Sequence, residues 1–230
     1  MIKNVFLDLD DTLLDFQKAE RIAISKAFNK LNIVYDDKLI ERYIQINLHC
    51  WKALERGEMS RDEVLISRFK ILFSEFKINV SATLAQNDYE EFLSREHDFL
   101  PEAKELLAEF EKTNKYDLYI ATNGIPEVQK PRIRDAKIAP YFKKIFISEE
   151  IGYAKPDGRF FEKCFCLIPN FKKEETIIVG DSLSSDIQGG INAGILTCHF
   201  NPKNQPYNNI KPDYTINNLS KLTELLDSIK

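Results

Sequence analysis

The sequence predicts an α/β fold in which a parallel β-sheet carries a separate helical insertion. Five short apolar runs have the pattern of buried parallel strands. Helical patterns separate the later runs, and strands that alternate with helices form parallel sheets with right-handed crossovers. Between about Phe16 and His97, by contrast, only helical periodicity is present. This segment is therefore expected to form a helical unit of its own.

The first predicted strand is continuously apolar and ends in acidic residues. A strand that is buried on both faces of a sheet is apolar at successive positions rather than at alternate ones. The same criterion gives four more strands later in the chain. The five predicted strands are residues 2–9, 116–122, 144–148, 176–180 and 195–200.

Helices are predicted between these strands from apolar stripes and end signals. Pro101 suits the first position of a helix, where the missing N–H is no loss. Another helix is expected after Asp157, and Gly194 is a typical stop for the next one. Pro131 should kink or shorten the helix that follows the second strand. A last helix is expected to start at about Ser220.

The inserted segment contains clear helix start signals. Asp36 is placed to cap a helix that Gly57 closes. Ser60 and Glu63 form a capping box at the start of the next helix. The predicted domains are a core of residues 1–15 and 98–230 and a helical cap of residues 16–97.

The composition is that of a globular protein without a strong charge preference. The chain has 230 residues, 43% of them hydrophobic, and a net charge of −4. Because phosphate backbones attract clustered Lys and Arg, nucleic acid is not the expected partner. The N-terminus turns acidic too early for a signal peptide, and no apolar run is long enough for a membrane span. A cytoplasmic location is expected, with Cys50, Cys164, Cys166 and Cys198 reduced, since one C-x-C pair is a poor zinc signal.

Acidic side chains follow two of the predicted strands. Asp8 and Asp10 end the first strand, and Asp181 and Asp186 follow the fourth. If these strands are neighbours, the carboxylates converge where open α/β sheets bind ligands. Two like unit charges about 4 Å apart repel each other by roughly 4 kcal/mol at an effective dielectric near 20. Such a cluster therefore needs a cation, and all-oxygen ligands suit Mg²⁺ better than zinc. The alternative for Asp8 and Asp10 alone is an acidic turn without a metal.

Two further strand ends supply groups that bind phosphate. Thr122 and Asn123 follow the second strand, where a hydroxyl, an amide and backbone N–H groups suit phosphate oxygens. Lys155 is expected to be held near the fourth strand by a stiff Lys-Pro turn. A solvated lysine is the alternative for Lys155 taken alone. Four signals at four strand ends in this order indicate an active site.

At this point the chain resembles the haloacid dehalogenase-like (HAD) hydrolases over its whole length. The resemblance implies a Rossmann-like parallel sheet with a C1 cap after the first strand, and a small-molecule phosphate monoester as substrate. The four ordered motifs that carry it are Asp8-x-Asp10-x-Thr12, Thr122, Lys155-Pro156 and Gly180-Asp181-x₄-Asp186.

The resemblance also implies a role for each motif residue. Asp8 is expected to be the nucleophile, forming a phosphoaspartyl intermediate, and a Mg²⁺ ligand. Asp10 is expected to act as general acid and base and to lend the metal its backbone carbonyl. Asp181 is expected to bind Mg²⁺ and Asp186 to support the metal through water. The remaining expected roles are phosphate binding by Thr122 and charge neutralisation by Lys155.

Several further stretches look like the bacterial pyrimidine 5′-nucleotidases of this superfamily, which implies a nucleoside 5′-monophosphate as substrate. They include Gln129 and Arg132 after the second strand, and Asn47, Trp51 and Arg68 in the cap. On this hypothesis Trp51 stacks on a base, and Asn47 or Arg68 reaches the base or the sugar. Trp51 is also in phase with apolar neighbours, which is equally typical of a core residue.

Three other functions remain open at the level of the sequence. A sugar-phosphate or phosphoglycolate phosphatase would use the same motifs, and a phosphomutase would also keep Asp10. A dehalogenase would lack this acid, because a halide leaves without a proton. A non-catalytic phosphate-binding protein on this scaffold is the alternative from another class, although no motif residue is missing.

Overall fold

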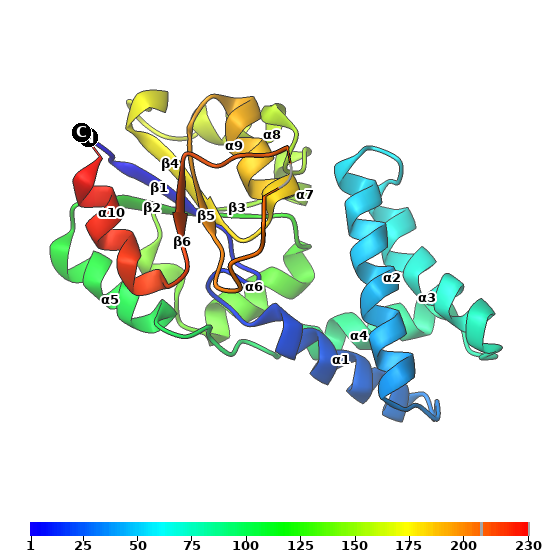
Figure 1. Ribbon diagram of the computed structural model, residues 1–230. Helices are drawn as coiled ribbons and strands as arrows, with labels where there is room; N and C mark the ends of the chain where they lie inside the picture. The colour runs from blue at the N-terminus through cyan, green and yellow to red at the C-terminus, as the bar shows by residue number, and fades with distance from the viewer. Residues whose placement is uncertain (208, 230) are drawn as a thin grey trace.

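Six parallel strands form the centre of the protein (Figure 1). In the computed structural model, which describes residues 1–207 and 209–229, their order across the sheet is β3-β2-β1-β4-β5-β6. β1 pairs with both β2 and β4, so the carboxyl ends of these three strands lie together. The strands are β1 (Asn4–Leu7), β2 (Asp117–Thr122), β3 (Lys144–Ile147), β4 (Thr176–Gly180), β5 (Leu196–Phe200) and β6 (Tyr214–Ile216).

The predicted α/β fold is confirmed, and each of the five predicted strands is present. The sequence did not predict β6, which pairs with β5 at the edge of the sheet. Its three residues, of which only Ile216 is buried, are too few to give an apolar pattern.

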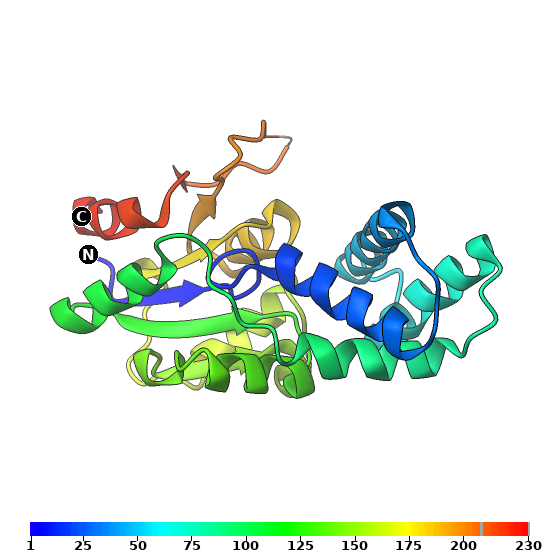
Figure 2. The same cartoon turned by 90° about the horizontal axis from the view of Figure 1, so that it is seen from below.

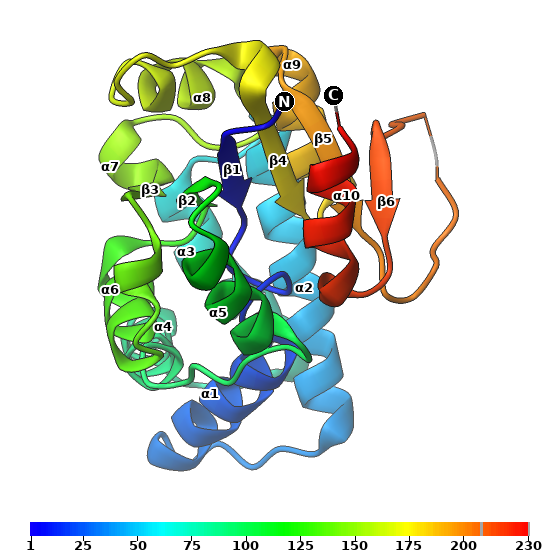
Figure 3. The same cartoon turned by 90° about the vertical axis from the view of Figure 1, so that its left-hand side faces the viewer.

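Helices cover both faces of the sheet, because successive side chains of a strand point to opposite sides. Val5 and Leu7 pack under α5 and α10, which lie side by side (Figure 3). Phe6 packs under α8 on the other face, where α9 lies against α8. The helices of the core are α5 (Ala103–Thr113), α6 (Pro126–Asp135), α7 (Ser148–Ile151), α8 (Gly158–Phe165), α9 (Gln188–Ala193) and α10 (Leu222–Ser228), with single turns η1 (Ala139–Tyr141), η2 (Lys173–Glu175), η3 (Leu183–Ile187) and η4 (Leu219–Lys221).

The predicted helix ends are partly correct. Gly194 does terminate α9, with φ of 70°. The expected start at Pro101 is wrong, because Glu102 adopts a left-handed conformation with φ of 62° and α5 begins only at Ala103. Pro131 lies inside α6, which continues to its end four residues later.

Four helices inserted between β1 and β2 form a cap beside the sheet (Figures 1 and 2). They pack mainly as α1 with α4 and α2 with α3, around a core that includes Phe28, Tyr43 and Phe69. Both predicted start signals are present: Asp36 accepts a hydrogen bond from the N–H of Leu39, and the capping box opens α3. The cap helices are α1 (Phe16–Lys30), α2 (Asp37–Glu55), α3 (Arg61–Phe76) and α4 (Ala82–Leu93).

The chain enters and leaves the cap through two paired segments. The N–H of Asp15 donates to the carbonyl of Asp98 at 2.9 Å, and the N–H of Leu100 donates to the carbonyl of Leu13 at 3.0 Å. Leu14 forms isolated β-bridges with both Asp10 and Phe99. We propose that the cap extends over residues 16–97, with its boundaries at these paired segments. Among the described residues, no helix combines the length and apolar character that a membrane span requires.

Candidate active site

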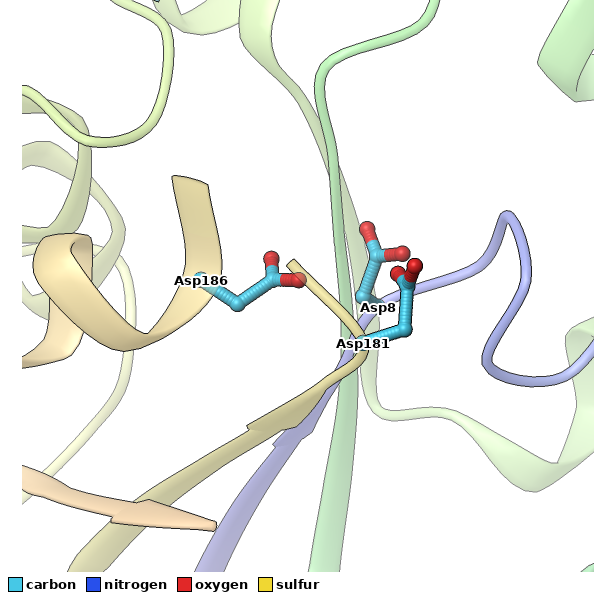
Figure 4. Close-up of side chains that lie close together, drawn as sticks. All are labelled: Asp8, Asp181 and Asp186. Carbon is cyan, nitrogen blue, oxygen red and sulfur yellow. The ribbon is translucent and has the colours of Figure 1, made fainter. Parts of the chain in front are cut away.

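The ends of the two central strands bring three aspartates together. Asp8 directly follows β1, and its N–H donates to the carbonyl of Val179 in β4 at 3.0 Å. Asp181 follows β4, and Asp186 lies in η3. One carboxylate oxygen from each of the three aspartates lies within 4.8 Å of the others. In Figure 4 the carboxyl groups of Asp8 and Asp181 lie next to each other, with that of Asp186 facing them.

The aspartates repel one another, and their pKa values reflect this. Burial raises the pKa of Asp8 to about 8; Lys155 opposes this shift, and Asp186 and Asp10 add to it. Burial, together with the charges of Asp186 and Asp8, also raises the pKa of Asp181. The lysine therefore compensates the negative charge only in part, and the cluster favours a bound cation.

The unpaired oxygens show where a cation fits. Within residues 1–207 and 209–229, Oδ2 of Asp8 and both carboxylate oxygens of Asp181 have no hydrogen-bond partner. Both oxygens of Asp186 are used: Oδ1 accepts from Lys155 at 2.5 Å and Oδ2 accepts from the N–H of Ser182 at 3.0 Å. An all-oxygen donor set of this kind fits Mg²⁺. Asp8 and Asp181 are thus suited to hold the metal directly, and Asp186 to hold the lysine.

Lys155 is a buried cation whose three N–H groups are all used. Its Nζ donates to Oδ1 of Asp8 at 2.7 Å, to Oδ1 of Asp186 at 2.5 Å and to the carbonyl of Ala121 at 2.5 Å. Burial lowers the pKa of Lys155, but the charges of Asp186 and Asp8 outweigh this and leave it raised. The lysine therefore stays protonated beside Asp8 and fixes the orientation of that carboxylate.

The side chain of Asn123 holds the backbone of Lys155. Its Oδ1 accepts from the N–H of Lys155 and its Nδ2 donates to the carbonyl of Lys155, both at 2.8 Å. Nδ2 also lies 3.2 Å from Oγ of Ser185. The amide of Asn123 thus positions the lysine, and its expected contact with phosphate stays a prediction.

Two residues of α6 hold the other predicted catalytic groups. Gln129 donates to Oδ2 of Asp10 at 2.7 Å and to Oγ1 of Thr122 at 2.8 Å. Arg132, which is fully buried, donates from Nη1 to Oδ1 of Asp10 at 2.5 Å. Sequence reasoning gave these two residues no role. Their three-residue spacing places them on one helix face, but Pro131 between them weakened the helix signal.

A cavity of about 670 Å³ separates the strand ends from the cap. Asp8, Thr122 and Lys155 line it from the core. The cap residues predicted to read the substrate also line it: Trp51 is partly exposed, whereas Asn47 and Arg68 are buried in hydrogen bonds with other cap residues. The predicted residues from core and cap are thus brought to one cavity.

Polar contacts join the cap to the core at two places beside this cavity. Lys52 of α2 lies 3.3 Å from Oγ of Ser182 and also contacts Ser184. Arg61 at the start of α3 donates to Oγ of Ser148 at 2.5 Å and lies 3.3 Å from Glu149. The cap is therefore held against α7, which follows β3, and against Ser182 and η3, which follow β4.

Comparison with known proteins gives a consistent result. A family model described as haloacid dehalogenase-like hydrolase matches residues 2–194. The HAD-hydrolase YfnB of Bacillus subtilis is 39% identical, over 98% of this chain and 95% of its own length. A crystal structure of YfnB bound to magnesium, which reveals interdomain movement in that protein, matches with a TM-score of 0.93 and covers 98% of this chain and 99% of that one.

Two relatives carry a more specific name. The pyrimidine 5′-nucleotidase PynA of Streptococcus pneumoniae is 36% identical over 98% of this chain and 95% of its own length. The pyrimidine 5′-nucleotidase YjjG of Escherichia coli is 29% identical over 96% of both chains.

Proposed function

This chain belongs to the haloacid dehalogenase-like hydrolases, and on that basis we propose that it is a Mg²⁺-dependent phosphatase of pyrimidine nucleoside 5′-monophosphates. The observation that carries the phosphatase assignment is the pair of Asp8 and Asp181 at adjoining strand ends, with Lys155 bound to Asp8, facing one cavity. The names of PynA and YjjG support the choice of substrate.

Asp8 acts as the nucleophile in this proposal. Lys155 donates to Oδ1 of Asp8 and so holds this carboxylate in place at the cavity. Phosphate monoesters are hydrolysed extremely slowly without a catalyst, and a carboxylate nucleophile splits the reaction into two easier displacements. Attack by Asp8 releases the alcohol and leaves a phosphoaspartyl group, which water then hydrolyses to phosphate and the free carboxylate.

Asp8 and Asp181 would hold the magnesium ion, with the carbonyl of Asp10 as the further ligand that the family scheme implies. When bound, the ion would supply positive charge for the phosphoryl oxygens and offset the repulsion between the aspartates. Lys155, which forms an ion pair with Asp8, supplies a second positive charge. Thr122 binds a phosphoryl oxygen through its hydroxyl, which Gln129 orients.

Asp10 transfers the protons. It protonates the leaving oxygen in the first displacement and takes a proton from the attacking water in the second. Gln129 and Arg132 hold both of its oxygens and so fix its position relative to Asp8. An acid at this position favours an alkoxide leaving group over a halide, so it supports phosphatase rather than dehalogenase activity.

A substrate panel tests the proposal. Phosphate release is measured with UMP, dUMP, dTMP, CMP, AMP, ribose 5-phosphate and phosphoglycolate, with and without Mg²⁺. We expect Mg²⁺-dependent turnover, with the highest kcat/KM for pyrimidine nucleotides. Equal or higher kcat/KM for ribose 5-phosphate or phosphoglycolate would assign the chain to the sugar-phosphate or phosphoglycolate phosphatases. No turnover of any ester would favour a phosphate-binding protein.

A further inference from the structure

Each of the four cap helices contributes to a chain of buried hydrogen bonds at the cavity wall, here called the cap network. Arg68 of α3 donates to Oδ1 of Asn47 in α2 and to Oε1 of Gln86 in α4, both at 2.7 Å. Asn47 in turn donates to Oε1 of Glu20 in α1 at 2.5 Å, and Gln86 donates to Glu90. Glu20, Asn47, Arg68 and Gln86 are each no more than 3% exposed.

Stability alone does not account for the cap network. The four helices already share an apolar core, and buried ionic groups rarely stabilise a protein more than apolar side chains of the same size. The network contains two carboxyl groups, Glu20 and Glu90, but a single guanidinium. Burial raises the pKa of Glu20 to about 7, although Asn47 and Arg68 oppose the shift. A buried carboxyl group at a cavity, with one oxygen unpaired among the described residues, is a candidate for a functional role.

The hydrogen bonds of the network fix which groups face the cavity. Because Arg68 donates to the amide oxygen of Asn47, the amide nitrogen must point toward Glu20. Oε2 of Glu20 has no hydrogen-bond partner in the described part of the chain, and Glu20 and Asn47 both line the cavity. The network therefore ends in an unpaired acceptor on Glu20 beside the second N–H of Asn47.

We propose that Glu20 accepts a hydrogen bond from the imide N3–H of a uracil or thymine base while Asn47 donates to the adjacent carbonyl. In uracil and thymine the imide N3–H has a carbonyl group on each side. An acceptor with a neighbouring donor can therefore bind N3–H and one carbonyl group in either orientation of the base. Cytosine presents a donor next to an acceptor in one order only, so it can bind Glu20 and Asn47 in one orientation only. This assignment rests on the proposed nucleotidase function and names the residue that selects the base.

The test compares UMP, 3-methyluridine 5′-monophosphate and ribose 5-phosphate in the wild type and in Glu20→Gln. The glutamine keeps an oxygen for Asn47 but turns its NH₂ toward N3–H, so two donors face each other. We expect the ratio of kcat/KM for UMP to that for ribose 5-phosphate to fall about ten- to hundredfold, as for loss of a charge-assisted hydrogen bond. The wild type should disfavour the methylated nucleotide to a similar degree.

Glu20→Gln should no longer distinguish UMP from the methylated nucleotide. Glutamine and glutamate have the same size, so a purely steric penalty for the methyl group would survive the substitution and would overturn the assignment. Glu90→Gln is the matched control, because it removes a carboxylate from the other end of the cap network. Glu90 also lines the cavity, so an equal loss of selectivity in Glu90→Gln would assign the choice of base to the network charge or to Glu90 and would overturn the specific role of Glu20.

The two proposals fail in different ways. A wild type that does not prefer UMP over ribose 5-phosphate would overturn the nucleotidase function. A wild type that prefers UMP, together with a Glu20→Gln variant that keeps the preference, would overturn only the role of Glu20.

Discussion

Two polar clusters face each other across the cavity, and they are built in opposite ways. In the cluster of Asp8, Asp181 and Lys155, the two aspartates stand at the ends of the paired strands β1 and β4, and several of their oxygens have no partner among the described residues. The cap network joins side chains from four helices, and at its α1 end Oε2 of Glu20 has no partner among the same residues. This difference indicates that the sheet carries the chemistry and the cap carries the selectivity, so substitutions should separate the two.

The largest expected effect comes from the substitution of Asp8, the proposed nucleophile. Asp8→Asn should lower kcat for every substrate by about 10⁴-fold or more, because an amide cannot form the phosphoenzyme. Steady-state phosphate release with saturating Mg²⁺ measures this. The exposed Asp62 on α3 is the control, and Asp62→Asn should retain wild-type turnover. Full activity in Asp8→Asn would show that the cluster at the strand ends does not supply the nucleophile.

The next largest expected effect is a change in the free energy of unfolding, caused by Glu20 in the cap. The pKa of Glu20 is raised from 4.5 to about 7, so the folded protein holds this proton more tightly than the unfolded chain does. The contribution of this proton to the free energy of unfolding is fully present below about pH 4.5 and is lost as the pH rises through 7. Glu20→Gln should therefore stabilise the protein by up to roughly 3 kcal/mol at pH 8 to 9, and by almost nothing near pH 4.

Urea denaturation at several pH values measures this difference. Glu41→Gln is the control, since Glu41 lies on the cap surface with its side chain 51% exposed. A Glu20→Gln variant with the same pH dependence as the wild type would mean that Glu20 is not buried as a charge.

A smaller effect is expected from the side chain that holds Lys155. Asn123→Ala removes both hydrogen bonds to the lysine backbone and should lower kcat about ten- to hundredfold, because small misplacements of a catalytic group are costly. The selectivity between UMP and ribose 5-phosphate should not change. Asn192, which donates to the carbonyl of Pro156 at 2.9 Å from the outside, provides the control variant Asn192→Ala. Equal losses of kcat in Asn123→Ala and Asn192→Ala would show that Asn123 has no specific role in positioning Lys155.

The smallest effect tests the contacts that close the cap. Arg61→Ala breaks the link to Ser148 and Glu149 and should raise KM about two- to fivefold with little change in kcat, the scale of one partly exposed ion pair. Added salt should reduce the difference. Arg42→Ala removes an ion pair with Glu75 that lies wholly within the cap, so KM should stay unchanged. A similar rise in KM in both variants would point to cap stability rather than closure.

The core of the site could be predicted because it depends on local patterns. An apolar run followed by an acid locates a strand end, and the ends of neighbouring parallel strands meet whatever lies between them in the sequence. The positions of Asp8 and Asp181 follow from this rule, whereas Lys155 lies beyond α7 and is positioned by Asn123. The strand β6 could not be predicted, because its pairing with β5 comes from the fold rather than from its own three residues.

The cap side of the site could be predicted only in part. Trp51, Asn47 and Arg68 were suggested by resemblance, and they do line the cavity. Glu20 was missed because it follows Lys18 and precedes Arg21 in a charged stretch that reads as a solvated helix face. Its burial arises only when α1 packs against helices from distant parts of the sequence. Side chains that depend on such packing leave no local signal.

The paired segments at the base of the cap connect its position to that of Asp10. Leu14 bridges both Phe99 in the returning segment and Asp10 in the loop after β1. The carboxylate of Asp11 also accepts hydrogen bonds from the N–H groups of Phe16 and Gln17, the first residues of α1. A hinge rotation of the cap must therefore bend the same short loop that carries Asp10. Opening of the cap would therefore also shift Asp10, the proposed acid and base.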